Sequence, residues 1–147
     1  MKRYVLDSNL YIEAVRDAGR AEELKRFVAQ CLPSIYLHAA VAQELLAGAV
    51  DHRRARLIEE SLIRPFERRE RIITPRFGTW KRAGRIMARL VQEKRMSAGG
   101  FGRSFVNDCL LGASCREDGF ALITRNTRDF KLIQHVEPFD VVEPWPV

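Results

Sequence analysis

The sequence predicts an α/β domain in which helices flank a mainly parallel sheet. Short apolar runs typical of buried strands recur along the chain, and stretches with apolar residues at helical spacing separate them. Strands that alternate with helices in this way form parallel sheets, because each helix returns the chain to the start of the next strand. The 147 residues suit one domain, and no internal repeat or linker divides them, so we expect a single domain over residues 1–147.

Turn-forming and capping residues set the expected element boundaries. Asp7, Ser8 and Asn9 are helix-capping types, and Ala18-Gly19 and Pro33 are expected to end the first and second helices. The glycine-rich segment at Gly99–Gly102 is expected to be a loop. The expected strands are residues 3–6, 35–37, 72–73, 120–124 and 139–142, and the expected helices are residues 9–17, 20–31, 39–49, 52–66, 77–95, 104–117 and 127–134.

Helical spacing also predicts which side chains face inward. In residues 52–66 the apolar side chains, Leu57 and Leu62 among them, are expected to face the core while the arginines face solvent. In residues 77–95, the longest helical pattern, Trp80 falls on the apolar side. The stripe containing Leu24, Phe27 and Val28 suits either the core or a dimer interface.

Composition limits the classes of protein to consider. No apolar run approaches the length needed to cross a bilayer, and Met1-Lys2-Arg3 leads directly into a strand, so we expect a cytoplasmic protein without a signal peptide. The net charge of +6 permits a polyanionic partner but does not require one. The three cysteines form no CxxC pair and are expected to be reduced, and the scattered histidines make a zinc site improbable.

Four acidic residues lie at positions where a functional site is expected. Asp7 follows the first strand, and Asp129 lies just beyond the strand that ends at Thr124; sites in parallel sheets form at these carboxyl ends. Glu44 and Asp108 lie in apolar helical stretches, where a buried carboxylate needs a cation. Each acid also has a purely structural interpretation: a helix cap, a surface glutamate, or an acid favoured by a helix dipole.

The order of these motifs resembles that of the PIN-domain family, and within it of VapC-type toxins. The matching segments are YVLDSN at residues 4–9, VAQEL at 41–45, Asn107-Asp108, and LITRNTRDF at 122–130. The resemblance implies a PIN-like three-layer fold with a pocket of acids at the carboxyl edge of the sheet. It assigns Asp7, Glu44, Asp108 and Asp129 as catalytic residues and metal ligands, with Asn9, Thr124 and Asn126 as supporting polar residues.

This resemblance implies a Mg²⁺- or Mn²⁺-dependent endoribonuclease that cleaves RNA by metal-activated attack of water on phosphate. Carboxylates are hard oxygen donors that suit these ions. Arg103 and Arg125 adjoin the acidic motifs and are candidates for RNA phosphate contacts.

The family also implies a cognate antitoxin and a homodimer. Two alternatives remain open at this point: a housekeeping or DNA-directed PIN nuclease, and a PIN domain that binds nucleic acid or protein without cutting.

Overall fold

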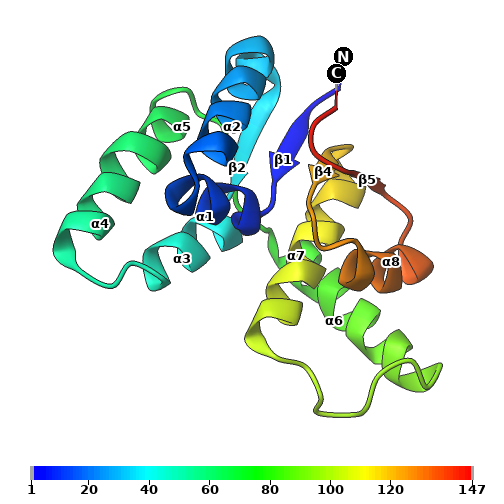
Figure 1. The fold of residues 1–147 in the computed structure, drawn as a ribbon. Helices are drawn as coiled ribbons and strands as arrows, with labels where there is room; N and C mark the ends of the chain where they lie inside the picture. Colours follow the sequence, from blue (N-terminus) through cyan, green and yellow to red (C-terminus); the bar gives the residue numbers. More distant parts are fainter. Residues whose placement is uncertain (1, 147) are drawn as a thin grey trace. The chain divides into compact units, whose positions relative to one another are not determined.

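The computed structural model describes residues 2–146, and these residues form two compact units. Unit 1 comprises the described residues up to Thr74, and unit 2 comprises Pro75–Pro146. Within each unit, strands pair in parallel and helices pack beside them (Figure 1). The expected α/β, PIN-like fold class is confirmed.

Unit 1 contains three parallel strands. Tyr4 of β1 (Tyr4–Leu6) pairs with Ile35 of β2 (Ile35–His38), and Leu37 of β2 pairs with Ile72 of β3 (Ile72–Ile73). The helices of this unit are α1 (Ser8–Arg16), α2 (Ala18–Cys31), α3 (Ala39–Ala47), α4 (His52–Leu57) and α5 (Arg64–Arg68), with a 3₁₀ turn at Leu32–Ser34. Buried apolar side chains of the strands and of α1 and α3 form its core.

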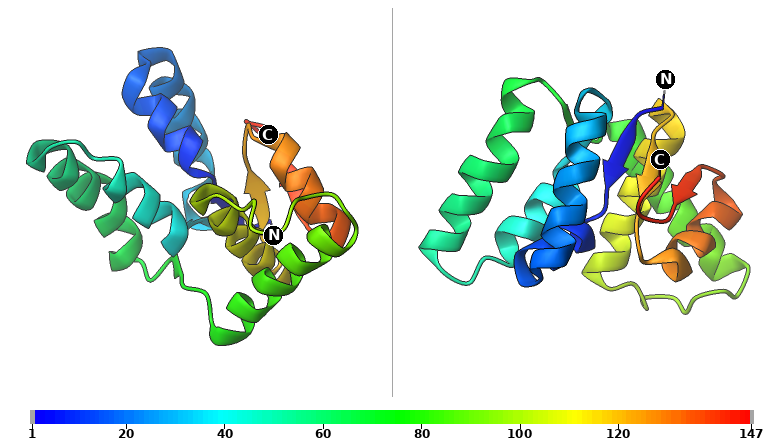
Figure 2. Two further views of the ribbon diagram at one scale, coloured as in Figure 1. Left: turned by 90° about the horizontal axis from the view of Figure 1, so that it is seen from below. Right: turned by 45° about the horizontal axis from the view of Figure 1, so that its top comes forward.

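A π-helical segment, Ile58–Ile63, joins α4 to α5, so the helical run expected at residues 52–66 is nearly continuous from His52 to Arg68. Pro65 is the second residue of α5. A proline removes a backbone hydrogen bond to the preceding turn and crowds a carbonyl group of that turn. The wider π turn accommodates such a break in the α-helical pattern. In both views of Figure 2 this run lies across from α1 and α2.

Unit 2 consists of three helices and two parallel strands. The helices are α6 (Phe77–Gln92), α7 (Arg103–Asp118) and α8 (Thr127–Val136). Strand β4 (Ala121–Ile123) pairs with β5 (Asp140–Val142). Gly119 ends α7 with a left-handed backbone (φ 72°), which glycine adopts without strain.

Three local expectations were wrong. Ala18 begins α2 rather than breaking a helix, because the side chain of Asp17 caps it. Leu57 is 58% exposed and Trp80 is 55% exposed, so neither contributes to the core. The α2 stripe, for which both the core and a dimer interface were expected, divides: Phe27 is buried against Tyr4, whereas Leu24 and Val28 line a groove.

Two further expectations concern the cysteines and the membrane. All three cysteines are free thiols, and two of them, Cys109 and Cys115, are buried. In the part of the chain that the structure describes, no helix has both the length and the apolar character to span a membrane.

Candidate functional site

Asp7 lies where β1 ends and α1 begins. Its side chain is only 4% exposed, and Oδ1 accepts a hydrogen bond from the backbone N–H of Ser8 at 2.8 Å. The carboxylate therefore caps α1, and its charge lies at the helix end where the backbone dipole stabilises an anion. The structural interpretation of Asp7 as a cap and its proposed role as a buried acid are thus compatible.

Glu44 on α3 is brought to the start of α1. The hydroxyl of Ser8 donates a hydrogen bond to Glu44 Oε2 at 3.2 Å, across 36 positions of sequence. The buried His38 caps α3 at its N-terminus, where its Nδ1 accepts from the backbone N–H of Ala40. Sequence reasoning treated Ser8 only as a capping type, because a partner this far along the chain leaves no local signal.

Asn9 supplies a further oxygen in this part of unit 1. Its Oδ1 is buried and makes no hydrogen bond within residues 2–146. Leaving a buried polar atom unsatisfied costs free energy, so such an atom needs an explanation such as a ligand or an ion. The ligand atoms that Asp7, Glu44 and Asn9 can offer to a metal ion are therefore oxygens, which Mg²⁺ and Mn²⁺ prefer.

Unit 2 positions Asp108 within a buried stretch of α7. Asp108 is 3% exposed, its neighbour Asn107 is also buried, and apolar side chains follow on the same helix. A solvated helix-dipole acid, the structural alternative for Asp108, would instead be exposed in the first turn. Burying a carboxylate at this cost is typical of a site that binds a cation.

Asp129 belongs to a small hydrogen-bonded group after β4. Asn126 donates from Nδ2 to Asp129 Oδ2 at 3.2 Å, and the backbone N–H of Asn126 donates to Thr124 Oγ1 at 2.9 Å. The two residues predicted to support the site on this side, Thr124 and Asn126, are therefore connected to the acid they would support. Asp129 itself lies half-buried in the first turn of α8.

The four acids are therefore divided between the units, with Asp7 and Glu44 in unit 1 and Asp108 and Asp129 in unit 2. Over residues 2–146, no group of three or more His, Cys, Asp or Glu side chains is placed to bind a metal ion. Two candidate phosphate-binding residues, Arg103 and Arg125, are exposed in unit 2. The Arg82 side chain on α6 forms ion pairs with Glu117 and Glu137.

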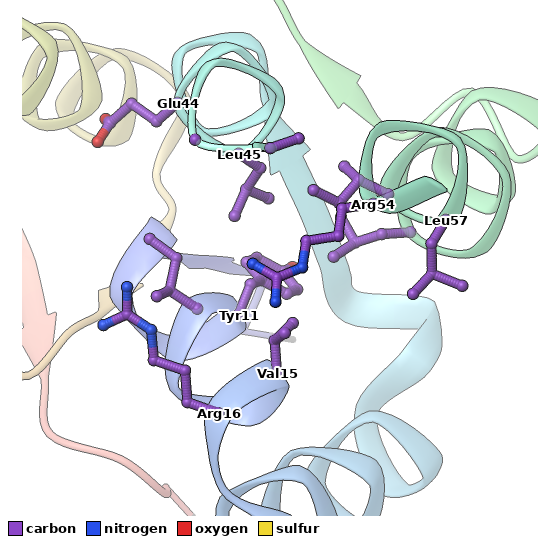
Figure 3. Close-up of a pocket in the computed structure, with 12 residues that line it drawn as sticks. Tyr11, Val15, Arg16, Glu44, Leu45, Arg54 and Leu57 are labelled. Carbon is purple, nitrogen blue, oxygen red and sulfur yellow. The ribbon is translucent and has the colours of Figure 1, made fainter. Parts of the chain in front are cut away.

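Unit 1 also contains two adjoining cavities between α1–α2 and the helical run of residues 52–68. The larger, of about 620 Å³, is an apolar groove lined by side chains that include Leu24, Val28 and Phe66. The smaller, of about 400 Å³, is lined at one end by Glu44 and contains Arg16 and Arg54 (Figure 3). Both cavities share the lining residues Tyr11, Val15, Leu57, Ile58 and Leu62.

Comparison with known proteins identifies related sequences and folds. The family model described as "PIN domain" matches residues 4–136, a span that includes all four acids. No curated protein sequence matches the chain.

Three solved structures with the same fold are complexes. A DNA-bound VapBC from Salmonella typhimurium is similar with a TM-score of 0.73 at 17% identity, covering 97% of this chain and 98% of that one. A DNA-bound VapBC2 from Rickettsia felis has a TM-score of 0.65 at 20% identity, covering 97% and 98%. A toxin–antitoxin complex from Klebsiella pneumoniae has a TM-score of 0.64 at 22% identity, covering 98% and 99%.

Proposed function

Because the chain belongs to the PIN-domain family, we propose that it is a metal-dependent endoribonuclease that acts in the cytoplasm as the toxin of a toxin–antitoxin pair. The observation that carries this proposal is the burial of two carboxylates, Asp7 and Asp108, at positions that match the family's motifs. Burying a carboxylate is unfavourable unless its charge is compensated, so a buried carboxylate in each unit is compatible with binding of a cation. That residues 1–147 act as one PIN domain remains part of the proposal.

The proposed metal ligands are Asp7, Glu44, Asp108 and Asp129, and the fit to Mg²⁺ or Mn²⁺ rests on their all-oxygen chemistry. When bound, such an ion polarises a phosphate and lowers the pKa of a coordinated water. The side chains of this protein hold the acids in place for that role. Ser8 fixes Glu44 through its hydroxyl, and Asn126 fixes Asp129 through its amide.

RNA is the proposed substrate, and we propose that Arg103 and Arg125 contact its phosphate groups. Both side chains are exposed. Arg125 lies between Thr124 and Asn126, and Arg103 is the first residue of α7, the helix that carries Asp108. An acidic site repels a polyanion, so cationic side chains nearby are needed for the backbone to approach.

The toxin role rests on two observations. Proteins with the same fold were solved as VapBC and toxin–antitoxin complexes. In addition, unit 1 leaves an apolar groove open to solvent, and apolar surface of this kind is typical of protein-binding sites. We therefore propose that a cognate antitoxin docks in this groove, and that the chain forms a homodimer.

The experiment that tests the nuclease is cleavage of total RNA by the purified protein, freed of any partner, with Mg²⁺ or Mn²⁺ and then with EDTA. The Asp7→Asn variant serves as the control for contaminating nucleases, because the amide keeps the shape of the side chain and can still cap α1. Cleavage that needs the metal and disappears in the variant supports the proposal. If the protein cleaves only DNA, the proposed substrate is wrong and the protein is a DNA-directed nuclease. If it cleaves neither RNA nor DNA, the alternative of a binding domain without catalytic activity is favoured.

A further inference from the structure

The solvent face of α8 carries a line of cationic side chains. Arg128 and Lys131 lie about one helical turn apart, and both are exposed. Arg125, in the segment that joins β4 to α8 (Figure 1), precedes them and is also exposed. The helix buries Phe130 and Ile133 on its other face, so the helical spacing directs the basic residues towards solvent. Arg125, Arg128 and Lys131 are called the α8 stripe below.

The two helical members of the α8 stripe are not neutralised by acids. Among the residues that the structure describes, neither Arg128 nor Lys131 forms an ion pair. An arginine on a neighbouring helix behaves differently, since Arg82 of α6 contacts Glu137 at 2.8 Å. The charge of Arg128 and Lys131 is therefore available to a ligand, whereas that of Arg82 is used within unit 2.

The α8 stripe adjoins the hydrogen-bonded group around Asp129. Arg125 lies in the segment that forms this group, and Arg128 directly precedes Asp129 in the first turn of α8. Lys131 lies about 4.5 Å farther along the helix axis than Arg128, at 1.5 Å for each residue. The positive charge thus begins beside a proposed metal ligand and continues away from it along one helix.

The surface around the α8 stripe indicates which kind of ligand it binds. Over residues 2–146, none of the exposed large apolar side chains lies on α8. Helices that bind a protein or lie on a membrane typically expose apolar side chains beside their charges. A nucleic-acid strand instead carries one phosphate for each nucleotide, and cationic side chains suffice to bind it. The charge and the missing apolar surface together favour a nucleic-acid strand.

We infer that the α8 stripe binds the phosphates of the RNA strand on one side of the cleaved bond. An efficient substrate should therefore extend roughly two to three nucleotides beyond the bond on that side, one for each cation that a phosphate can reach. Phosphate contacts carry no sequence information, so the preference concerns length and not bases. This inference rests on the proposed function, because only a substrate held at Asp129 places its strand along α8.

The first measurement is the binding of a fluorescent single-stranded RNA to the intact protein in EDTA, which prevents metal-dependent cleavage. In the double variant Arg128→Gln/Lys131→Gln the Kd should rise roughly 5- to 20-fold at about 0.1 M salt. The slope of log Kd against log salt should fall by about 1.4, because each lost phosphate contact on a single strand removes about 0.7.

Lys81→Gln/Arg85→Gln is the matched control for this variant. It removes one lysine and one arginine from exposed positions of α6 that form no ion pair with the described residues. The control should change the Kd by less than about 2-fold, because salt screens charges that do not contact the strand. Both double variants should keep the melting temperature of the natural sequence, since all four side chains are exposed. Equal losses of affinity in the two would show a general charge effect and overturn the inference.

A series of RNA substrates then locates the α8 stripe relative to the cleaved bond. Nucleotides added one at a time should lower KM on one side of the bond only, level off after about three, and leave kcat nearly unchanged. The gain from these nucleotides should disappear in Arg128→Gln/Lys131→Gln and persist in the α6 control. Equal gains in the two variants, or equal gains on both sides of the bond, would contradict the inference.

Binding and cleavage together separate this inference from the proposed function. RNA binding that depends on the α8 stripe, without cleavage in Mg²⁺ or Mn²⁺, would overturn the nuclease and leave the stripe as an RNA-binding surface. Cleavage with unchanged Kd and KM in Arg128→Gln/Lys131→Gln would overturn the stripe alone. A protein that neither binds nor cleaves RNA would overturn both.

Discussion

The two units use their surfaces differently. Unit 1 leaves an apolar groove open to solvent and arranges cationic side chains around it, whereas helices α6, α7 and α8 of unit 2 pack closely and are joined by ion pairs. At Gly112 the packing of α7 leaves no room even for a methyl group. The groove proposed to bind a partner and the tightly packed helices therefore lie in different parts of the chain.

The largest effect is expected at a proposed ligand in unit 2. Asp108→Asn should lower RNA cleavage by at least about 100-fold, because a neutral amide binds a divalent ion more weakly than a carboxylate does. Losing a direct metal ligand costs more activity than losing a residue that only supports a ligand. Asp118→Asn, at the exposed end of the same helix, is the matched control and should retain activity. Steady-state cleavage with Mg²⁺ measures both variants, and full activity in Asp108→Asn would contradict the proposed role of Asp108 as a metal ligand.

The close packing of unit 2 can be disrupted by one methyl group. In Gly112→Ala the new Cβ would lie 2.8 Å from Ile133 Cγ2 and 3.1 Å from Phe139 Cε1, so we expect a loss of roughly 1–3 kcal/mol in unfolding free energy. Gly84→Ala on α6 meets nothing within 4 Å and should stabilise the protein by up to about 1 kcal/mol. Urea unfolding measures the change in unfolding free energy for both variants. If the two changes had the same sign, the packing described at Gly112 would be contradicted.

Acid should destabilise unit 1 through His38. Burial lowers the pKa of His38 from 6.5 to about 4, so the folded state takes up a proton less readily than the unfolded chain. The neutral, buried His38 therefore contributes its full stabilisation above the pKa that it has in the unfolded chain. This stabilisation is lost as the pH falls towards the pKa that His38 has in the folded protein. Between pH 7 and pH 5 the loss should be about 2 kcal/mol.

His38→Asn provides the comparison, because asparagine can cap α3 without titrating. Its unfolding free energy should fall less steeply over the same pH range in urea titrations. Parallel curves for the two proteins would show that His38 does not account for the acid sensitivity.

The smallest effect is expected from the ion pairs of unit 2. Arg82 contacts Glu137 at 2.8 Å and Glu117 at 3.4 Å, but all three side chains are partly solvated, so Arg82→Gln should cost about 1 kcal/mol or less. Arg85→Gln, three positions along α6, removes a charge that forms no ion pair with the described residues and should be neutral. Thermal unfolding at low and at high salt distinguishes the two variants, since salt should reduce only the destabilisation caused by Arg82→Gln.

Local patterns predicted most of the fold, because strands and helix caps leave short-range signals. They also singled out the four acids, whose role as metal ligands stays a prediction. Apolar spacing could not distinguish a buried helix face from an exposed one, so Leu57 and Trp80 were placed incorrectly. The π segment lies just before Pro65, and the spacing of apolar residues does not distinguish it from an α-helix. The contact of Ser8 with Glu44 and the unsatisfied hydroxyl of Tyr11 depend on tertiary structure, so they could be found only there.

The burial of two cysteines has a practical consequence for labelling. Burial raises the pKa of Cys109 to about 12 and that of Cys115 further, so at neutral pH neither supplies a thiolate to an alkylating dye. Cys31 is partly exposed, and the residue that follows it, Leu32, lines the apolar groove. A maleimide fluorophore should therefore attach at one position of the natural sequence, where it reports directly on whether the groove is filled.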